Sequence, residues 1–528
     1  MATGRQRNSR SSTRRLASAP RRGGSLGRPA EVRPQREGES SGDGHWLRSR
    51  EPARPRPATR GGSEHALVSV RDNERLLEHE TEVKAAFDRI EPFLRRLSAM
   101  QHEAGFVDRA QGMARSELGF ELPQQVLEDA WIQQLDIRYL FAWCVFETYR
   151  AYADDFYRRE PLAPDPAEAD RFQAWLQECG FHAVDISPCS DGRLAHVIRY
   201  VLRLPHGLVR RKSFAGAMFD VEASLKRWVE TELGRFREGV PNTADAPTRY
   251  LKLAVYHYSS SDPEHQGCAA HGSDTEKAAA AARDRLQDFQ QAIENSFCCG
   301  ASIDLLLVGL DTDTDAIRVH PPDGGGDPDP GRFVDAETLF DETTGLGAEA
   351  ARERVEERVA AEAGGSEPGM RRFVAGLVEN NFAQIAYVRA HHNGRYADIG
   401  HNERFMGVGM GFEEVQLRNL TYFAYLQTVE EGAPDLDVGV KIFSGLNAGR
   451  GLPVPVVLRF DYHGQVPGAR ERAEARTRRV AEALCNRYPK LAEQGLLHTL
   501  MAVRDCGNNG TLEVIGSSLE PTGTGDTH

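Results

Sequence analysis

The sequence predicts an α/β protein in which a helical N-terminal domain precedes a domain built on a parallel sheet and a degenerate copy of that domain. Three observations support this fold class. Apolar residues recur every three or four positions from about Ala66 to Glu160, a strand–helix–strand order spans residues 248–311, and the same order returns over residues 454–505. A chain of 528 residues is also too long for one ordinary core, so several domains are expected.

Residues 1–65 form an arginine-rich segment. They contain 15 Arg, no Lys and 6 acidic residues among Ser, Gly and Pro, with almost no aliphatic residues. Such a composition cannot offset its chain entropy by burial, which predicts a disordered tail. Because the whole chain carries a formal charge of −13, residues 66–528 carry −22. The basic tail suits a tether for an acidic partner, and the alternatives are nucleic acid as the partner, a targeting peptide or a solvated appendage.

Residues 66–165 are predicted to form the helical domain, which the proline-containing stretch "REPLAPDPAEAD" (159–170) closes. The sequence contains no run of about 18 apolar residues that would indicate a transmembrane helix, and no apolar signal-peptide core follows the basic N-terminus. We therefore expect a soluble, intracellular protein. The eight cysteines are too sparse for a disulfide framework, which favours free thiols available for a metal or for catalysis.

Residues 166–405 and 406–528 are predicted to share one scaffold. The first contains the strand "TRYLKLAVYHY" (248–258), a helix over 275–297 and the strand "SIDLLLVGLD" (302–311). The second contains "VPVVLRFDYHG" (454–464), a helix over 469–491 and "LLHTLMAVRD" (496–505). Aligning the two places Asp461 at His257, and aligning "VKIFSGLNAGR" (440–450) with "VDISPCSDGR" places Gly445 at Cys189 and Asn447 at Asp191. The second copy is therefore expected to lack a metal site.

Reactive side chains follow two predicted strands of the first copy. Cys189, Asp191 and Arg193 come after one strand, and His257 ends another, so all four are expected at the carboxyl edge where parallel sheets bind ligands. Together with Cys268 they offer a Cys2His set, and three protein ligands leave the open position of a catalytic zinc. If the chain stays extended, Asp191 and Arg193 point to the same side as Cys189. Arg193 would then orient Asp191, which could accept a hydrogen bond from a water activated by zinc.

The residues leave alternatives open. His265 and His271 could complete a four-ligand structural zinc site, and each candidate ligand alone could simply be a core residue. The stretch "RAHHNGRYADIGH" (389–401) could supply a proton-shuttling histidine, although solvated loop histidines are favoured. Residues 311–322 lack the Gly and Glu of a calcium loop, "MGVGMGF" (406–412) is expected to be a turn, and Cys298 and Cys299 are expected to be core residues.

The stretches "CSDGR" and "HYSSSDPEHQGCAAHG" resemble the carboxysomal, shell-associated carbonic anhydrases, a divergent branch of the β-class, and the resemblance covers nearly the whole chain. The eleven positions from His257 to Cys268 exceed the spacing of ordinary β-class enzymes and are typical of this branch. The resemblance implies a β-carbonic-anhydrase-like catalytic domain. It also implies that Cys189, His257 and Cys268 hold one zinc per chain and that Asp191 and Arg193 form the catalytic dyad.

By the same resemblance the enzyme interconverts bicarbonate and CO2 and supplies CO2 to Rubisco inside the carboxysome, at the inner face of its shell in the bacterial cytoplasm. The tail would bind Rubisco or shell proteins, and the chain would form a homodimer or a larger homo-oligomer, with neither nucleic acid nor a membrane as a partner. The alternative function is a non-enzymatic scaffold with a structural zinc and a basic tail that binds acidic partners.

Overall fold

The structure, a computed structural model, describes residues 65–68, 71–161, 167–205, 210–240, 242–243, 245–297, 302–426, 428–507 and 510–519. The arginine-rich segment up to residue 64, and Cys298 and Cys299, lie outside the described residues, so the predictions made for them stay predictions. None of the helices in the described ranges is long and apolar enough to cross a membrane.

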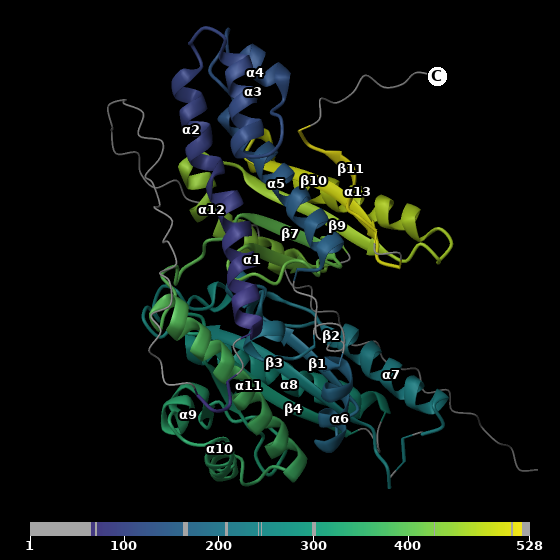
Figure 1. Cartoon of the computed structure of the whole chain (residues 1–528). Helices are drawn as coiled ribbons and strands as arrows, with labels where there is room; N and C mark the ends of the chain where they lie inside the picture. Colours follow the sequence, from purple (N-terminus) through teal and green to yellow (C-terminus); the bar gives the residue numbers. More distant parts are fainter. Residues whose placement is uncertain are drawn as a thin grey trace, which may run out of the picture. The chain divides into compact units, whose positions relative to one another are not determined.

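The first described region is helical, as predicted (Figure 1). Its longest helix, α5, is capped at its N-terminus by the Asp136 side chain, which accepts a hydrogen bond from the Tyr139 N–H at 3.0 Å. Leu140 and Phe146 of this helix belong to one buried cluster with Val457 and Leu500 of the second sheet. The helices are α1 (Arg71–Asp88), α2 (Ile90–Met100), α3 (Phe106–Glu117), α4 (Gln124–Asp129) and α5 (Ile137–Arg159).

The first sheet has the order β2-β1-β3-β4-β5-β6, in which the first four strands are parallel, β5 is antiparallel to β4, and β6 is antiparallel to β5. Its strands are β1 (Ala183–Pro188), β2 (Arg210–Arg211), β3 (Arg249–Tyr258), β4 (Ser302–Asp311), β5 (Ile317–His320) and β6 (Val334–Asp335). The long helices are α6 (Glu168–Glu178), α7 (Val221–Arg237), α8 (Thr275–Phe297), α9 (Ala336–Thr343), α10 (Ala348–Glu362) and α11 (Pro368–His392). Four short helical turns also occur: η1 (Gly192–Leu194), η2 (Val197–Val201), η3 (Ala215–Ala217) and η4 (Ala269–His271).

The second sheet repeats this topology. Its order is β11-β10-β9-β7-β8, so β8, β7, β9, β10 and β11 correspond to β2, β1, β3, β4 and β5, with the same strand directions. The predicted degenerate copy is confirmed as a fold. Its elements are β7 (Phe405–Met410), β8 (Thr421–Tyr425), α12 (Ala433–Leu446), η5 (Ala448–Arg450), β9 (Val454–Tyr462), α13 (Ala469–Arg487), α14 (Pro489–Glu493), β10 (Leu497–Asp505) and β11 (Glu513–Ser517).

The alignment of residues 440–450 with the Cys189 strand is wrong, because these residues lie in α12 and η5. Leu436, Val440 and Phe443 are buried at helical spacing, which makes this segment one face of a helix. The counterpart of β1 is instead β7, the segment "MGVGM" that was expected to be a turn. Gly409 permits this close pairing, since its φ is +131° and a Cβ there would lie 2.0 Å from the Arg459 carbonyl oxygen.

Strand register identifies the true counterparts of the reactive residues. Pro188 pairs with Val255 on β3, two residues before His257. In the second copy Gly409 pairs with Arg459 on β9, two residues before Asp461. Met410 therefore takes the place of Cys189, rather than Gly445. The pairing of Asp461 with His257 is retained.

Candidate metal centre and active site

The reactive turn begins where β1 ends. The Cys189 N–H donates to the Val255 carbonyl on β3 at 3.0 Å, and Cys189 pairs with Phe214 in an isolated bridge. The chain then turns, because the Asp191 side chain caps η1 by accepting from the Arg193 N–H at 3.0 Å. The condition that the chain stays extended from Cys189 to Arg193 is not met, because η1 begins at Gly192. The turn, and not strand alternation, brings Asp191 and Arg193 together.

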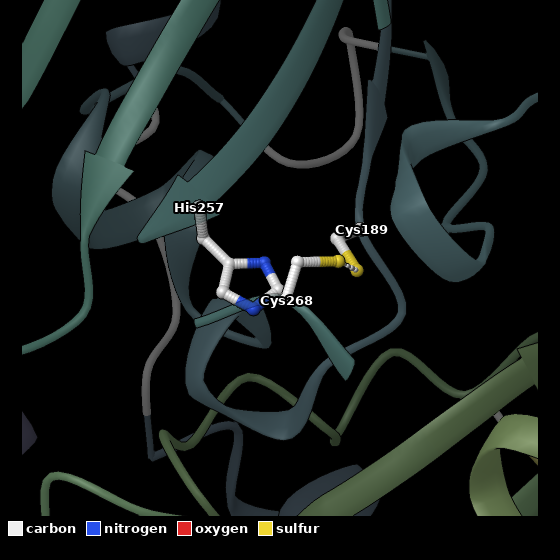
Figure 2. A group of neighbouring side chains, drawn as sticks. All are labelled: Cys189, His257 and Cys268. Carbon is white, nitrogen blue, oxygen red and sulfur yellow. Dashed lines mark hydrogen bonds between the residues drawn. The ribbon is translucent and has the colours of Figure 1, made fainter. Parts of the chain in front are cut away.

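The three predicted ligands lie side by side (Figure 2). Their candidate ligand atoms are all within 4.8 Å of one another, and the sulfurs of Cys189 and Cys268 are 3.9 Å apart. Each residue is at most 5% exposed. Two sulfurs held by a tetrahedral zinc at about 2.3 Å are about 3.8 Å apart, so the spacing of the thiols and the donor set both fit that ion.

The two histidines considered for a closed four-ligand site lie outside this group. The His265 side chain is 73% exposed and pairs with Asp262 at 2.8 Å. His271 Nε2 instead lies 3.3 Å from the Gly216 carbonyl oxygen. Within the described ranges, the cluster around the two thiols contains three Cys or His residues. This geometry favours three ligands and an open position over a closed structural site.

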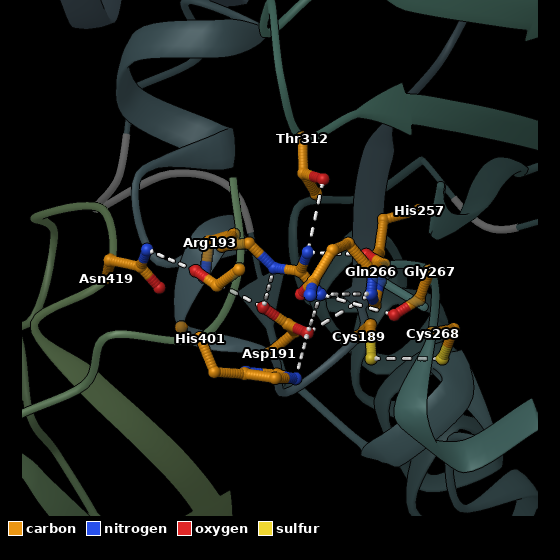
Figure 3. Close-up of polar contacts among 12 residues, drawn as sticks. Cys189, Asp191, Arg193, His257, Gln266, Gly267, Cys268, Thr312, His401 and Asn419 are labelled. Carbon is orange, nitrogen blue, oxygen red and sulfur yellow. Dashed lines mark hydrogen bonds and ion pairs between the residues drawn. The ribbon is translucent and has the colours of Figure 1, made fainter. Parts of the chain in front are cut away.

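Arg193 holds Asp191 in one orientation (Figure 3). Its Nε donates to Asp191 Oδ1 at 2.9 Å and a terminal nitrogen donates to Oδ2 at 2.8 Å, a bidentate pair. Arg193 is itself fully buried and donates to the backbone carbonyls of Gln266, Gly267 and Ile399 at 2.5, 3.3 and 2.9 Å. Burial opposes ionisation of Asp191, but the positive charges of Arg193 and His401 outweigh it and hold the pKa of Asp191 well below its usual range.

The Cys189 sulfur is held by the backbone of η3. The Gly216 N–H donates to Cys189 Sγ at 3.2 Å. This residue has a φ of +65°, and a Cβ would lie 2.4 Å from His271 Nε2, so the position requires glycine. The neighbouring Ala215 N–H donates to Asp435 at the start of α12, in the second copy. Burial raises the pKa of the Cys189 thiol well above its usual value in the absence of a cation, so a thiolate here needs a positive partner such as a metal.

Residues that sequence analysis did not assign complete the site. His401 Nε2 lies 3.7 Å from Asp191 Oδ2, and its Nδ1 lies 3.0 Å from Glu403 Oε1. The favoured interpretation of His401 as a solvated loop histidine is therefore wrong. Gly192 is held from the second copy, because its carbonyl accepts from the Asn419 N–H at 2.8 Å. The sequence signal for the contacts of His401 and Glu403 is a His-x-Glu pattern just before β7.

Three family models match this chain. Residues 171–401 match the Carboxysome Shell Carbonic Anhydrase catalytic domain, residues 402–519 match its C-terminal domain, and residues 65–157 match its N-terminal domain. The chain belongs to the carboxysome shell carbonic anhydrase family. The predicted metal ligands and dyad all lie within the match to the catalytic domain.

Curated relatives agree with this assignment. The chain is 56% identical over 460 residues to the carboxysome shell carbonic anhydrase of Prochlorococcus marinus (strain MIT 9313), covering 87% of this chain and 90% of the relative. It is 56% identical over 461 residues to that of Parasynechococcus marenigrum (strain WH8102), covering 87% and 80%. It is 45% identical over 466 residues to that of Halothiobacillus neapolitanus (strain ATCC 23641 / c2), covering 86% and 90%.

These matches confirm the predicted family, the carbonic anhydrase activity and the carboxysomal localisation of the chain. They favour the enzyme over the non-enzymatic scaffold.

Proposed function

We propose that this carbonic anhydrase interconverts CO2 and bicarbonate at a zinc held by Cys189, His257 and Cys268, and that it supplies CO2 to Rubisco inside the carboxysome. The observation that carries the proposal is the cluster of two thiols and one imidazole within 4.8 Å, beside the buried Asp191–Arg193 pair. When bound, zinc acts as a Lewis acid that makes a hydroxide nucleophile available near neutral pH.

Asp191 and Arg193 have separate tasks in this proposal. The ionised Asp191 accepts a hydrogen bond from the attacking water or hydroxide and so orients its oxygen towards CO2. Arg193 occupies both carboxylate oxygens of Asp191 through the two bonds at 2.9 and 2.8 Å. This bidentate pair fixes the orientation of Asp191, whose Oδ2 lies 3.1 Å from His257 Nε2, so the carboxylate is held beside the proposed metal site.

The second copy supports a stoichiometry of one zinc per chain. Met410 and Asp461 stand where the first copy has Cys189 and His257, as the strand register defines. Asp461 is engaged by Arg459 through bonds of 2.8 and 3.2 Å. One chain therefore resembles a pair of β-class halves with one working site, and we expect such chains to associate as a homodimer or a larger homo-oligomer.

The wild-type protein and Asp191→Asn test this proposal together. The wild type should contain one zinc per chain by elemental analysis and should hydrate CO2. The variant should keep the zinc but lose about 10–100-fold in kcat, because all three ligands remain while the orienting carboxylate is lost. Asp284→Asn, an exposed carboxylate on α8, is the matched control and should behave as wild type.

Several results would contradict the proposal. Wild-type protein that binds zinc without hydrating CO2, or that lacks zinc while active, would refute the zinc mechanism. Two zincs per chain would refute the metal-free second copy. Full turnover by Asp191→Asn would refute the role given to that residue.

The arginine-rich tail, whose residues 1–64 are outside the described ranges, is proposed to dock the enzyme onto Rubisco or shell proteins. Its net charge of +9 over residues 1–65 suits many weak contacts with an acidic surface. The predicted boundary at residue 65 is one residue too long, because His65 is buried and its Nε2 lies 2.9 Å from Thr343 Oγ1. Deleting residues 1–64 should leave zinc content and CO2 hydration unchanged but abolish co-purification with Rubisco and recruitment into carboxysomes. Binding of the full chain should weaken steeply with salt, because exposed charge pairs are screened within about 8 Å at physiological ionic strength.

A variant with the tail arginines changed to glutamine separates charge from length. This variant should lose binding to Rubisco and shell proteins, as the deletion variant should. A tail of the same composition in scrambled order should still bind them. Normal entry of the truncated enzyme into carboxysomes would show that the residues needed for recruitment lie in the folded domains instead.

A further inference from the structure

The turn that holds the Cys189 sulfur has an unfavourable backbone. The sulfur accepts from the Gly216 N–H at 3.2 Å, and Gly216 belongs to η3. Gly216 and the following Ala217 both have left-handed backbone conformations, with φ of +65° and +60°. Alanine is sterically disfavoured in that region, so contacts from outside the turn are needed to maintain η3.

Asp435 supplies such a contact from the second copy. Its Oδ1 accepts from the Ala215 N–H, which is the amide directly before the one that donates to Cys189. Because peptide groups are planar, only the two backbone torsions of Ala215 separate these two N–H groups. Fixing the Ala215 N–H on Asp435 therefore restricts the direction in which the Gly216 N–H can point.

The Asp435 carboxylate is attached to a well-packed part of the second copy. Asp435 lies in the first turn of α12, where the next residue, Leu436, is fully buried. The hydroxyl of Tyr422 on β8 donates to the Asp435 carbonyl at 2.8 Å, and Tyr422 is itself buried. The packing of the second copy therefore sets the position of this carboxylate, independently of the segment that carries Cys189.

The environment of Asp435 makes its hydrogen bond to η3 a strong one. Asp435 is 6% exposed, and burial raises the pKa of its carboxyl to about 6, although the bond from the Ala215 N–H opposes this rise. The carboxyl is therefore ionised at neutral pH. An ionised acceptor forms a charge-assisted hydrogen bond, which is stronger than a bond between neutral groups.

The same turn also contacts the segment that carries Cys268. Cys268 directly precedes η4, and Nε2 of His271 in η4 lies 3.3 Å from the Gly216 carbonyl oxygen. A Cβ at Gly216 would lie 3.2 Å from the Cβ of Ala270, so η3 and η4 are in close contact. A shift of η3 would therefore change the separation of 3.9 Å between the sulfurs of Cys189 and Cys268.

We propose that Asp435 is a positioning residue for the metal ligands. Its carboxylate fixes η3, and η3 in turn holds the sulfurs of Cys189 and Cys268 at the spacing that suits zinc. The second copy, which is expected to hold no metal of its own, thereby supports the metal site of the first copy. This inference rests on the proposed function, because it concerns the metal that CO2 hydration is proposed to use.

The test measures the zinc affinity of the full chain by competition with a chromophoric chelator. Asp435→Ala should bind zinc about 10–100-fold more weakly than wild type, as expected when a residue that supports a metal ligand is lost. Asp435→Asn keeps an oxygen that can accept from the Ala215 N–H and should recover most of this loss. Asp437→Ala is the matched control on the same helix, because the Asp437 side chain is 54% exposed and pairs with Arg487, and it should bind zinc as wild type does.

Cobalt(II) in place of zinc gives a second readout, which a purely structural role of Asp435 would not change. The sulfur-to-cobalt charge-transfer absorption depends on the geometry and hydrogen bonding of the thiolates. It should therefore be altered in Asp435→Ala and should keep its wild-type form in Asp435→Asn and Asp437→Ala. Urea unfolding of the metal-free proteins measures any loss of overall stability separately.

The outcomes separate this inference from the proposed function. A folded Asp435→Ala protein with the zinc affinity and cobalt spectrum of wild type would overturn the inference, and so would an equal loss of affinity in Asp437→Ala. Both results leave the proposed function intact, whereas wild type without zinc-dependent hydration would refute that function. If Asp435→Ala does not fold, hydrogen exchange in the zinc-loaded wild type decides, because rapid exchange of the Ala215 and Gly216 amides would show that neither is held and would overturn the inference.

Discussion

Replacing Cys189 with serine should remove the zinc and reduce CO2 hydration by at least about a hundredfold. This loss is larger than the loss expected when a residue that only supports a metal ligand is replaced. A serine hydroxyl stays protonated at neutral pH and is a poor substitute for the soft, anionic thiolate that zinc binds. Serine is close to cysteine in size, and Cys189 makes its sulfur contacts with the Gly216 N–H and with Cys268, so the fold should survive.

Elemental analysis and stopped-flow hydration assays measure the two effects, and circular dichroism checks that the variant is folded. Cys485→Ser is a matched control, because Cys485 is a free, partly exposed cysteine on α13. It should retain zinc and activity. A folded Cys189→Ser protein with full zinc content would remove Cys189 from the proposed ligand set.

Replacing Arg459 with alanine should destabilise the folded chain by about 3–5 kcal/mol, as expected when one partner of a buried ion pair is removed. Arg459 is fully buried and contacts Glu414 Oε1 at 2.8 Å and Oε2 at 3.1 Å. It also donates to the hydroxyls of Tyr149 and Tyr157 on α5, at 2.9 and 2.8 Å. Alanine would leave the buried carboxylate of Glu414 without its cation and would weaken the attachment of α5 to the second sheet.

Urea unfolding, followed by fluorescence and circular dichroism, measures this loss of stability as a lower urea concentration at the unfolding midpoint. Arg470→Ala is the matched control, because the Arg470 side chain is 49% exposed and its ion pair with Glu474 should contribute less than about 1 kcal/mol. Zinc content should not change in the folded Arg459→Ala protein, since Arg459 lies in the second copy. A midpoint equal to that of Arg470→Ala would show that the buried network does not stabilise the fold.

Local sequence patterns were sufficient for the scaffold and for the predicted ligands. The continuous apolar run of β3, the helical spacing of α8 and the apolar run of β4 follow one another in the chain, and a strand–helix–strand order implies parallel pairing. The carboxyl ends of β1 and β3 then lie at the same edge of the sheet, because Pro188 pairs with Val255. Cys189 and His257 could therefore be predicted to meet without any knowledge of side-chain packing.

The sequence by itself determined the fold class, the duplication and the meeting of Cys189, His257 and Cys268. Only the tertiary structure decided that β7 is the partner of β9, because its glycines weaken the apolar signal of a strand while permitting the close approach to Arg459. Only the tertiary structure brought His401 to Asp191, across 210 positions of the chain. Periodicity reports how a segment packs against its neighbours in the sheet, whereas a contact between two loops far apart in the chain depends on the path of the whole chain between them, and no local pattern encodes that path.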